Sequence, residues 1–317
     1  MIYPNKIQIG FQEGTCPLKC NKCHAFGKNA KMTKEARKMP VEMAKKLIDE
    51  IEMLEKIPTI QPHIVTEPFA NKDLKEIILY CDGKGISFSI ITNGILLDED
   101  WLEFLIKYLN RSSTISFSLD AVTQETYEKV RGNYSLEDLE NKILYLIEHR
   151  GKKGPRVSVN FVYEEDNYAE KDLFLNKWKY KVDAVHIGVA LDSERRIPNA
   201  YRKSDNIKKR EICPFLEEVM TIDSGGEIRL CPIDSFGETN LGNVFEEGII
   251  PVWNGDKRKQ YMDKHQHMTL QKKDFCFACE WGYSLYDFDN VEDTEDFIIK
   301  SADYAVYYNR KEKWTDG

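Results

Sequence analysis

The stretch TCPLKCNKCHAFG, residues 15–27, places three cysteines within eight positions, at Cys16, Cys20 and Cys23. It directly follows KIQIGF, residues 6–11, whose alternating polar and apolar residues predict a strand. A structural zinc site takes four nitrogen or sulfur ligands, and four-iron clusters usually take four thiolates. His24 is the nearby candidate for a fourth ligand, but a residue next to Cys23 would struggle to turn back onto the same metal. The stretch therefore predicts a metal site that is one protein ligand short.

The other cysteines of this 317-residue chain support a metal-binding interpretation. Four lie near the end, at Cys213, Cys231, Cys276 and Cys279, whereas Cys81 stands alone on an apolar helix face and is expected in the core. Four thiolates are a full complement for either zinc or a [4Fe–4S] cluster, and the spacing alone leaves both open.

Composition restricts the class of protein. A net charge of −8 argues against a nucleic-acid partner, which would favour a basic face. No stretch reaches the roughly 20 apolar residues of a membrane helix, and the first residues lack the pattern of a secretory signal. We therefore expect a cytoplasmic protein with no membrane partner and with reduced cysteines in place of disulfides.

Strand-like and helix-like patterns alternate through the first two-thirds of the chain. Strands are predicted at residues 6–11, 62–68, 86–94, 113–120, 156–163 and 183–190, and helices at 40–57, 71–85, 98–109, 135–151 and 170–180. Such alternation predicts an α/β fold with a parallel sheet and right-handed crossovers. Six units would make an open or partial barrel, with reactive groups at the carboxyl ends of its strands.

The chain divides into the predicted barrel and three further parts. Residues 1–192 hold the predicted barrel, residues 193–212 a polar connector, and residues 213–285 a small cysteine-bearing domain. That domain contains a predicted hairpin at 219–231 with its turn at 223–226. Residues 286–317 are expected to form one amphipathic helix that packs on the body.

The cysteine stretch and the predicted barrel together resemble the radical S-adenosylmethionine (radical SAM) superfamily. In that family the same Cys-x3-Cys-x2-Cys spacing follows the first strand of a partial (β/α)6 barrel. The resemblance implies a [4Fe–4S] cluster on Cys16, Cys20 and Cys23, whose open iron binds S-adenosylmethionine (SAM). It also implies reductive cleavage of SAM to a 5′-deoxyadenosyl radical, which abstracts hydrogen from a substrate carbon.

Further residues match the family at successive strand ends. By resemblance, the SAM-binding candidates are Thr66, Glu67, Pro68, Asn93, Ser118, Asp120, Arg131 and Asn160. The family has Gly-Gly-Glu-Pro where this chain has Val65-Thr66-Glu67-Pro68, and Val and Thr restrict φ where Gly does not. An aromatic residue commonly precedes the third cysteine and covers the adenine, but here it is Lys22. The adenine contact then falls to Lys22 in a different way, or to His24 or Phe26.

The late cysteines resemble the twitch form of the SPASM extension. The shared features are a first cysteine, Gly226-x4-Cys231 in a hairpin, the LGNV and WNG segments, and Cys276-x2-Cys279. This implies one auxiliary [4Fe–4S] cluster with four protein ligands, suited to electron transfer. A flavodoxin- or ferredoxin-type protein is implied as the reductant.

Three functions remain open. The first is oxidation of a small polar sugar- or cyclitol-like intermediate, as in the aminocyclitol dehydrogenases of butirosin biosynthesis. The second is radical maturation of a short ribosomal peptide by cross-linking or epimerisation, and the third is a non-catalytic zinc-binding module. The chain begins at its first predicted strand, without a peptide-recognition domain, which favours the small molecule. Cys81 is the single spare thiol, which disfavours epimerisation.

A dehydrogenation also needs a proton acceptor near the reacting carbon. The candidates by location are His186 on the sixth predicted strand, Glu67, and Arg195 in the connector. Asp234 and Tyr283, near the auxiliary cysteines, are candidates for holding substrate hydroxyls.

Overall fold

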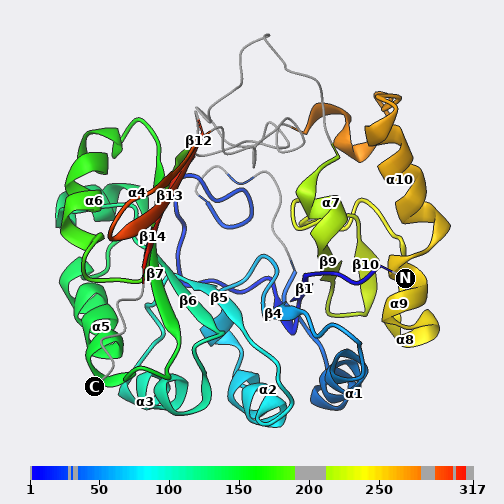
Figure 1. Ribbon diagram of the computed structural model, residues 1–317, viewed down its shortest axis with the longest axis horizontal. Coiled ribbons are helices and arrows are strands. Elements are labelled where there is room, and N and C mark those ends of the chain that lie inside the picture. Colours follow the sequence, from blue (N-terminus) through cyan, green and yellow to red (C-terminus); the bar gives the residue numbers. More distant parts are fainter. Residues whose placement is uncertain are drawn as a thin grey trace.

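The computed structural model describes residues 2–27, 30, 35–189, 212–279, 290–302 and 305–311. Parallel strands form the inner wall of the molecule, and helices form its outer layer (Figure 1). The six parallel strands of this wall are β1 (Lys6–Ile9), β4 (Thr59–Gln61), β5 (Ser89–Thr92), β6 (Thr114–Ser118), β7 (Arg156–Tyr163) and β8 (Ala184–Val189). They follow one another in chain order, and β4 meets β5 through a single bridge, Ile60–Phe88. This is the predicted α/β architecture of a partial barrel.

Helices between the strands cover the outer face. They are α1 (Val41–Glu52), α2 (Leu74–Cys81), α3 (Glu99–Tyr108), α4 (Gln124–Val130), α5 (Leu136–His149) and α6 (Lys171–Trp178). Apolar residues at helical spacing make the inward stripe of α1, where Ala44, Leu47, Ile48 and Ile51 are buried. Ser135 starts α5 as predicted, since its hydroxyl accepts the amide of Asp138. The short helix α4 was not predicted.

The predicted strand at 62–68 is wrong in position. The strand is β4, which ends at Gln61, and the following residues turn toward the cysteine loop. Pro62 has no amide to donate to a sheet, which explains why the strand ends before it. Val65 has a positive φ of 40°, which is incompatible with a strand. Short elements nearby are β2 (Gln12–Glu13), β3 (Arg37–Lys38), η1 (Pro68–Ala70) and η2 (Tyr168–Glu170).

The predicted hairpin is present and extends the sheet beyond β1. Its strands are β9 (Val219–Ile222) and β10 (Glu227–Arg229), joined through the predicted turn. Strand β9 lies parallel to β1 with Lys6 opposite Val219, so the edge strand of the barrel is paired. The other elements of this region are α7 (Pro214–Glu218), β11 (Gly242–Asn243), α8 (Val244–Glu247), α9 (Ile249–Trp253), α10 (Asp256–Gln266) and η3 (Phe275–Ala278). The helices α7 to α10 lie on the same side of the molecule as β9 and β10 (Figure 1).

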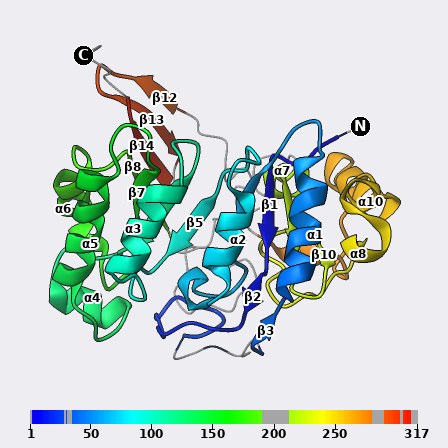
Figure 2. The same cartoon turned by 90° about the horizontal axis from the view of Figure 1, so that it is seen from below.

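The predicted C-terminal helix is wrong. The described residues of this segment form antiparallel strands β12 (Asn290–Asp293), β13 (Phe297–Ala302) and β14 (Ala305–Arg310). Strand β14 pairs antiparallel with β8, with Tyr307 opposite His186, so the second edge of the barrel is also covered (Figures 1 and 2). The open edge of β8 offers a row of backbone hydrogen bonds, and β-branched and aromatic side chains fit a sheet surface.

Side chains alternate between the two faces of the barrel wall. On β7, Val159 and Phe161 are buried, and Phe161 packs on Phe174 of α6 with ring centroids 4.8 Å apart. Asn160, the residue between them, therefore points to the inner face, where it lies beside His186 of β8. No helix of the described residues is long and apolar enough to span a membrane.

Candidate active site

The three-cysteine loop follows β2 and is held by tight backbone contacts. The amide of Cys23 donates to the carbonyl of Cys20, and the amide of Phe26 donates to Cys23 Sγ at 3.2 Å. Gly14 has a φ of 75°, and a Cβ there would lie 2.2 Å from the carbonyl oxygen of Glu35. A Cβ at Gly27 would lie 2.4 Å from the carbonyl oxygen of Cys23. Both ends of the loop therefore require glycine.

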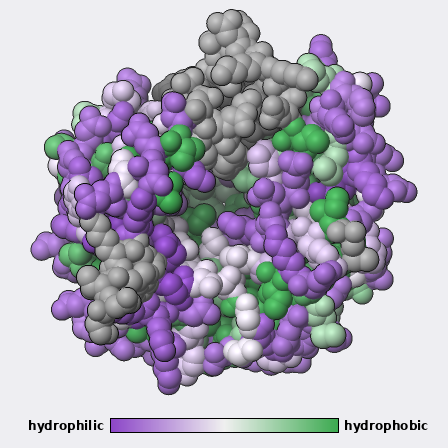
Figure 3. Space-filling model, in the orientation of Figure 1, coloured by the Kyte–Doolittle hydropathy of each residue, from purple (hydrophilic) through white to green (hydrophobic). Residues whose placement is uncertain are grey.

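All three cysteines line one cavity of about 250 Å³ at the carboxyl ends of the parallel strands. In the orientation of Figure 1, the surface has a hollow near its middle with hydrophobic side chains at its floor (Figure 3). Eight of the residues predicted to contact SAM line the cavity together with the cysteines: Lys22, His24, Phe26, Thr66, Glu67, Asn93, Ser118 and Arg131. Strand ends that are far apart in the sequence thus converge on the cysteine loop.

Glu67 is the buried carboxylate of this cavity. Its oxygens accept the hydroxyl of Thr92 at 2.5 Å and the amide of Asn93 at 2.9 Å. Burial raises the pKa of Glu67 to about 7, although these hydrogen bonds favour the charged form. The Asn93 side chain in turn reaches Cys16, with Nδ2 3.7 Å from Sγ.

Val65, beside Glu67, stands where the family pattern has glycine. Its φ of 40° lies in the left-handed region, which β-branched residues rarely adopt. The Val65 carbonyl accepts the amide of Gly14, and the Glu67 amide donates to the carbonyl of Thr15. The restriction expected from the loss of glycine is therefore present as a strained backbone that contacts the cysteine loop.

A buried ionic cluster lies under the cysteine loop. The Asp120 carboxylate pairs with Lys22 Nζ at 2.5 Å and with the Arg131 guanidinium, and it accepts the amide of Val162 at 2.6 Å. Burial would raise the pKa of Asp120, but Arg131 and Lys22 outweigh it and hold the pKa below its ordinary value. Arg131 Nη1 also lies 3.6 Å from Cys20 Sγ. The Lys22 ammonium group is thus paired with Asp120, and the sequence analysis did not predict this ion pair.

Other predicted residues lie outside the lining of this cavity. Asp120 is fully buried beneath it, and Pro68 begins η1. Asn160 and His186 lie on the next two strands of the inner face, where Asn160 Oδ1 is 3.1 Å from His186 Nδ1. Arg195 and Tyr283 lie outside the described residues.

His186 contacts an aromatic ring from the C-terminal strand. The Tyr307 and His186 ring centroids are 4.6 Å apart. Burial lowers the pKa of His186 to about 4, so the imidazole is neutral at pH 7. Tyr307 could not be predicted to lie here, because the sequence pattern was interpreted as a helix.

His63 is a lining residue that sequence reasoning missed. The Ile91 amide donates to His63 Nε2 at 3.1 Å, and burial lowers the pKa of this imidazole to about 3. The neutral ring therefore carries its proton on Nδ1 and can act only as a donor there. The signal in the sequence was a histidine four residues before Glu67.

The four late cysteines line a second, apolar cavity. Cys213 precedes α7, Cys231 follows β10, and Cys276 and Cys279 lie at η3. The remaining lining residues are Phe215, Leu216, Leu230, Ile233, His265 and Phe275. Burial, followed by the three neighbouring thiols, raises the pKa of Cys231 well above its ordinary value. Asp234 does not line this cavity; its carboxylate accepts the amides of Glu238 and Thr239.

Neither set of cysteines forms a site for a single ion. Within the described ranges, no group of three or more His, Cys, Asp or Glu side chains is arranged to hold one metal ion. Three thiols nevertheless line the first cavity and four line the second. Thiols that line a cavity are the ligands that an iron–sulfur cluster takes.

Two family models match the chain. The radical SAM superfamily matches residues 14–176, just over half of the chain, and the SPASM iron–sulfur cluster-binding domain matches residues 213–280. The Fe-coproporphyrin III synthase of Methanosarcina barkeri is 32% identical over 149 residues, which cover 46% of this chain and 35% of that enzyme. The match thus spans about a third of the curated relative's length.

Solved structures share the fold at low identity. BtrN, in complex with AdoMet and 2-DOIA, has a TM-score of 0.56 and 18% identity, covering 88% of this chain and 94% of BtrN. Streptococcus suis SuiB, bound to its precursor peptide SuiA, has a TM-score of 0.64 and 17% identity, covering 89% of this chain and 70% of SuiB.

The family matches also identify the cofactors, which are SAM and two [4Fe–4S] clusters. The thiols, three around the first cavity and four around the second, fit two such clusters by number and by type. The charged side chains of Glu67 and Arg131 in the otherwise mainly apolar lining of the first cavity suit a charged ligand, and the apolar walls of the second suit a closed cluster site. On these matches, the chain belongs to the radical SAM superfamily and carries a SPASM iron–sulfur cluster-binding domain.

Proposed function

We propose that this chain is a radical SAM oxidoreductase that oxidises a small polar substrate of the sugar or cyclitol kind. The observation that carries the proposal is the cavity in which three thiols meet Glu67 and Arg131. The thiols suit a cluster with one open iron, and the two charged side chains suit the amino and carboxylate groups of SAM. The four-thiol cavity then provides a separate acceptor for an electron.

The chain's residues divide the binding work as follows. Cys16, Cys20 and Cys23 hold the first cluster, and Cys213, Cys231, Cys276 and Cys279 hold the second. Glu67 suits the amino group of SAM, because a cation beside this carboxyl favours its charged form. Arg131 suits the SAM carboxylate, and Ser118 and Asn93 offer hydrogen bonds on the same wall. When bound, SAM and the clusters supply the one-electron chemistry that removes a hydrogen atom from the substrate.

His186 is proposed as the proton acceptor. With Asn160 Oδ1 as acceptor, His186 Nδ1 carries the proton and Nε2 keeps its lone pair. Loss of a hydrogen atom, a proton and an electron from an alcohol carbon leaves a ketone, and His186 Nε2 takes the proton. Tyr307 packs against the ring and fixes its orientation. Glu67, whose oxygens already accept three hydrogen bonds, is the weaker candidate.

Maturation of a short peptide is the second candidate function. It is favoured by the TM-score of 0.64 to SuiB with its precursor peptide, against 0.56 to BtrN. Such a likeness concerns the fold, so the substrate class needs its own experiment. A flavodoxin- or ferredoxin-type protein is the expected reductant in either case.

The first experiment tests the two cofactor sites. Anaerobic reconstitution should give about eight irons per chain, by the ligand count for two cubanes. Dithionite and SAM should then yield 5′-deoxyadenosine. The variant Cys276→Ala/Cys279→Ala should hold about four irons and still cleave SAM, because its first site is intact. A protein that binds iron but never produces 5′-deoxyadenosine would contradict the proposed chemistry.

The second experiment separates the substrate classes. Polyols and aminocyclitols deuterated at their alcohol carbons are compared with synthetic peptides deuterated at Cα and Cβ. Deuterium in 5′-deoxyadenosine together with a ketone product supports the oxidation of a small molecule. Transfer from the peptides alone would replace that proposal by peptide maturation. The His186→Gln variant should still cleave SAM but lose ketone formation, whereas unchanged ketone formation would exclude His186 as the acceptor.

A further inference from the structure

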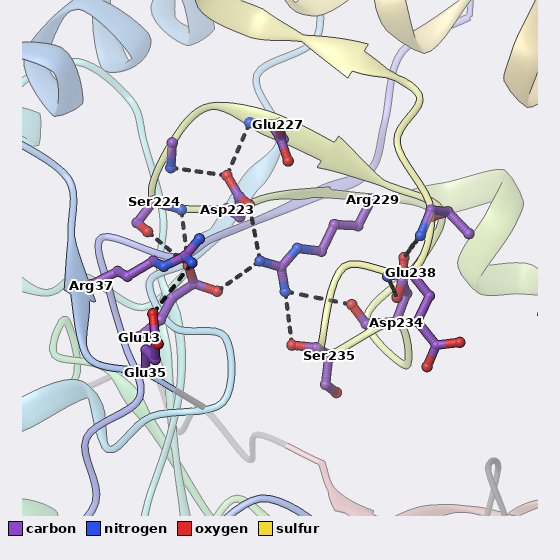
Figure 4. A network of polar contacts seen from close by, with 12 residues as sticks. Glu13, Glu35, Arg37, Asp223, Ser224, Glu227, Arg229, Asp234, Ser235 and Glu238 are labelled. Carbon is purple, nitrogen blue, oxygen red and sulfur yellow. Dashed lines mark hydrogen bonds and ion pairs between the residues drawn. The ribbon is translucent and has the colours of Figure 1, made fainter. Parts of the chain in front are cut away.

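A buried guanidinium connects the strand before the three-cysteine loop to the domain that holds the other four cysteines. Arg229, at the end of β10, is 3% exposed. Its Nη2 lies 3.1 Å from Glu13 Oε1 and 3.0 Å from Asp223 Oδ2 (Figure 4). Glu13 is fully buried on β2, three residues before Cys16.

The same guanidinium holds the segment that follows Cys231. Arg229 Nη1 donates to the carbonyl of Ser235 at 2.8 Å, and Figure 4 shows the side chain lying between that segment and Glu13. Phe236, the next residue, packs edge-on against His24, which follows Cys23, with ring centroids 5.8 Å apart. The segment after Cys231 therefore contacts the three-cysteine loop through Phe236 and the strand before that loop through Arg229.

Each carboxylate of this network is held on its other side as well. Glu13 Oε2 accepts the amide of Ser224 at 3.2 Å and its hydroxyl at 2.8 Å. Asp223 Oδ1 accepts the amides of Gly225 at 2.9 Å and Glu227 at 3.0 Å. A buried charge left without its partner is costly, so these groups keep one arrangement. The connection is thus held by hydrogen bonds at both ends.

We propose that Arg229 is a positioning residue that couples the two cysteine sites. Arg229 fixes the segment after Cys231 against Glu13. A ligand that orders the residues around the three-cysteine cavity, such as SAM, therefore also orders this segment of the four-cysteine site. The inference rests on the proposed binding of SAM at the first cavity. Because coupling is reciprocal, occupation of the four-cysteine site also strengthens binding at the first.

The test uses hydrogen–deuterium exchange of the reconstituted protein with and without SAM. In the native protein, SAM should slow exchange in residues 14–27 and also in residues 233–239, the latter by about fivefold or more. The variants Arg229→Lys and Glu13→Gln should keep the first protection and lose the second. Glu13→Gln keeps the size of the side chain but removes its charge and replaces one acceptor oxygen by an NH2 donor, so it breaks the network and serves if Arg229→Lys does not fold.

The matched control is Arg258→Lys. Arg258 is 2% exposed, and its guanidinium donates to the carbonyls of Leu216, Glu217 and Trp253, all within the same domain. This variant should keep the protection of residues 233–239. Protection of 233–239 that persists in both network variants, or that never occurs in the native protein, overturns the coupling. If SAM protects neither segment, the proposed SAM site itself fails.

Discussion

Replacement of Asp183 by Asn tests how much the barrel depends on ion pairing at the start of β8. The Asp183 carboxylate is 10% exposed and pairs with Arg111 Nη2 at 2.8 Å and with the guanidinium of Arg150. It also accepts the Val157 amide at 2.6 Å. Loss of one partner from a buried pair costs about 3–5 kcal/mol. Arg111 is 25% exposed and keeps some solvation, so we expect about 3 kcal/mol, the lower end of that range.

Urea unfolding of the metal-free protein, followed by circular dichroism, measures this loss. A change of about 3 kcal/mol with a slope of about 2 kcal/mol per molar urea moves the midpoint down by about 1.5 M. The control is Asp138→Asn, whose carboxylate is 62% exposed and pairs with Lys142 at 2.8 Å. It should change the free energy of unfolding by less than about 0.5 kcal/mol. An Asp183→Asn protein within about 1 kcal/mol of the native one would refute the reasoning.

The same carboxylate has a predictable pH dependence. Burial would raise the pKa of Asp183, but Arg150 and the Val157 amide outweigh it and hold the pKa below 3.8. The unfolded chain therefore binds the proton more readily, and the stability from this pair is complete above pH 3.8. It is lost as the pH falls through the lower pKa of the folded state. Asp183→Asn should lack this part of the acid sensitivity.

Three other substitutions have defined outcomes. The pKa of His186 is about 4 in the folded protein and about 6.5 in the unfolded chain, so the unfolded chain takes up the proton first as the pH falls. The free energy of unfolding should therefore fall by about 2 kcal/mol between pH 7 and pH 5 through this group. His186→Gln should remove that fall in urea titrations. Val65→Gly should raise the free energy of unfolding by about 1 kcal/mol by relieving the positive φ, whereas Thr66→Gly, without such a φ, should lower it. Gly14→Ala should reduce reconstituted iron from about eight to about four per chain, whereas Gly83→Ala, whose Cβ meets nothing within 4 Å, should leave it unchanged.

Hydrophobic periodicity was sufficient to predict most of the barrel. The strand at 156–163 and the start of α5 at Ser135 follow directly from local patterns, because alternation and capping are properties of adjacent residues. Residues 290–310 were misinterpreted because their aromatic and apolar residues also fit a helix. Their structure is decided by the free edge of β8, more than a hundred residues earlier in the chain.

The candidate site shows the same division. The grouping of the cysteines and the match of Glu67 to a family motif were visible in the sequence, and the structure brings Cys16, Glu67 and Arg131 to one cavity. The pairing of Lys22 with Asp120 and of Glu13 with Arg229 was not visible. The first pair is separated by 98 positions in the sequence and the second by 216. Such residues meet only after the strands have paired, and no local pattern predicts the contact.

Both edges of the barrel wall are covered by strands that are synthesised late, β9 on β1 and β14 on β8. A nascent chain that has left the ribosome only as far as residue 189 would expose two unpaired strand edges, which are prone to association with other chains. Its three-cysteine loop would also lack Arg229 and Phe236. We therefore expect iron insertion at that loop to follow the completion of synthesis, and truncated chains to depend on chaperones for solubility.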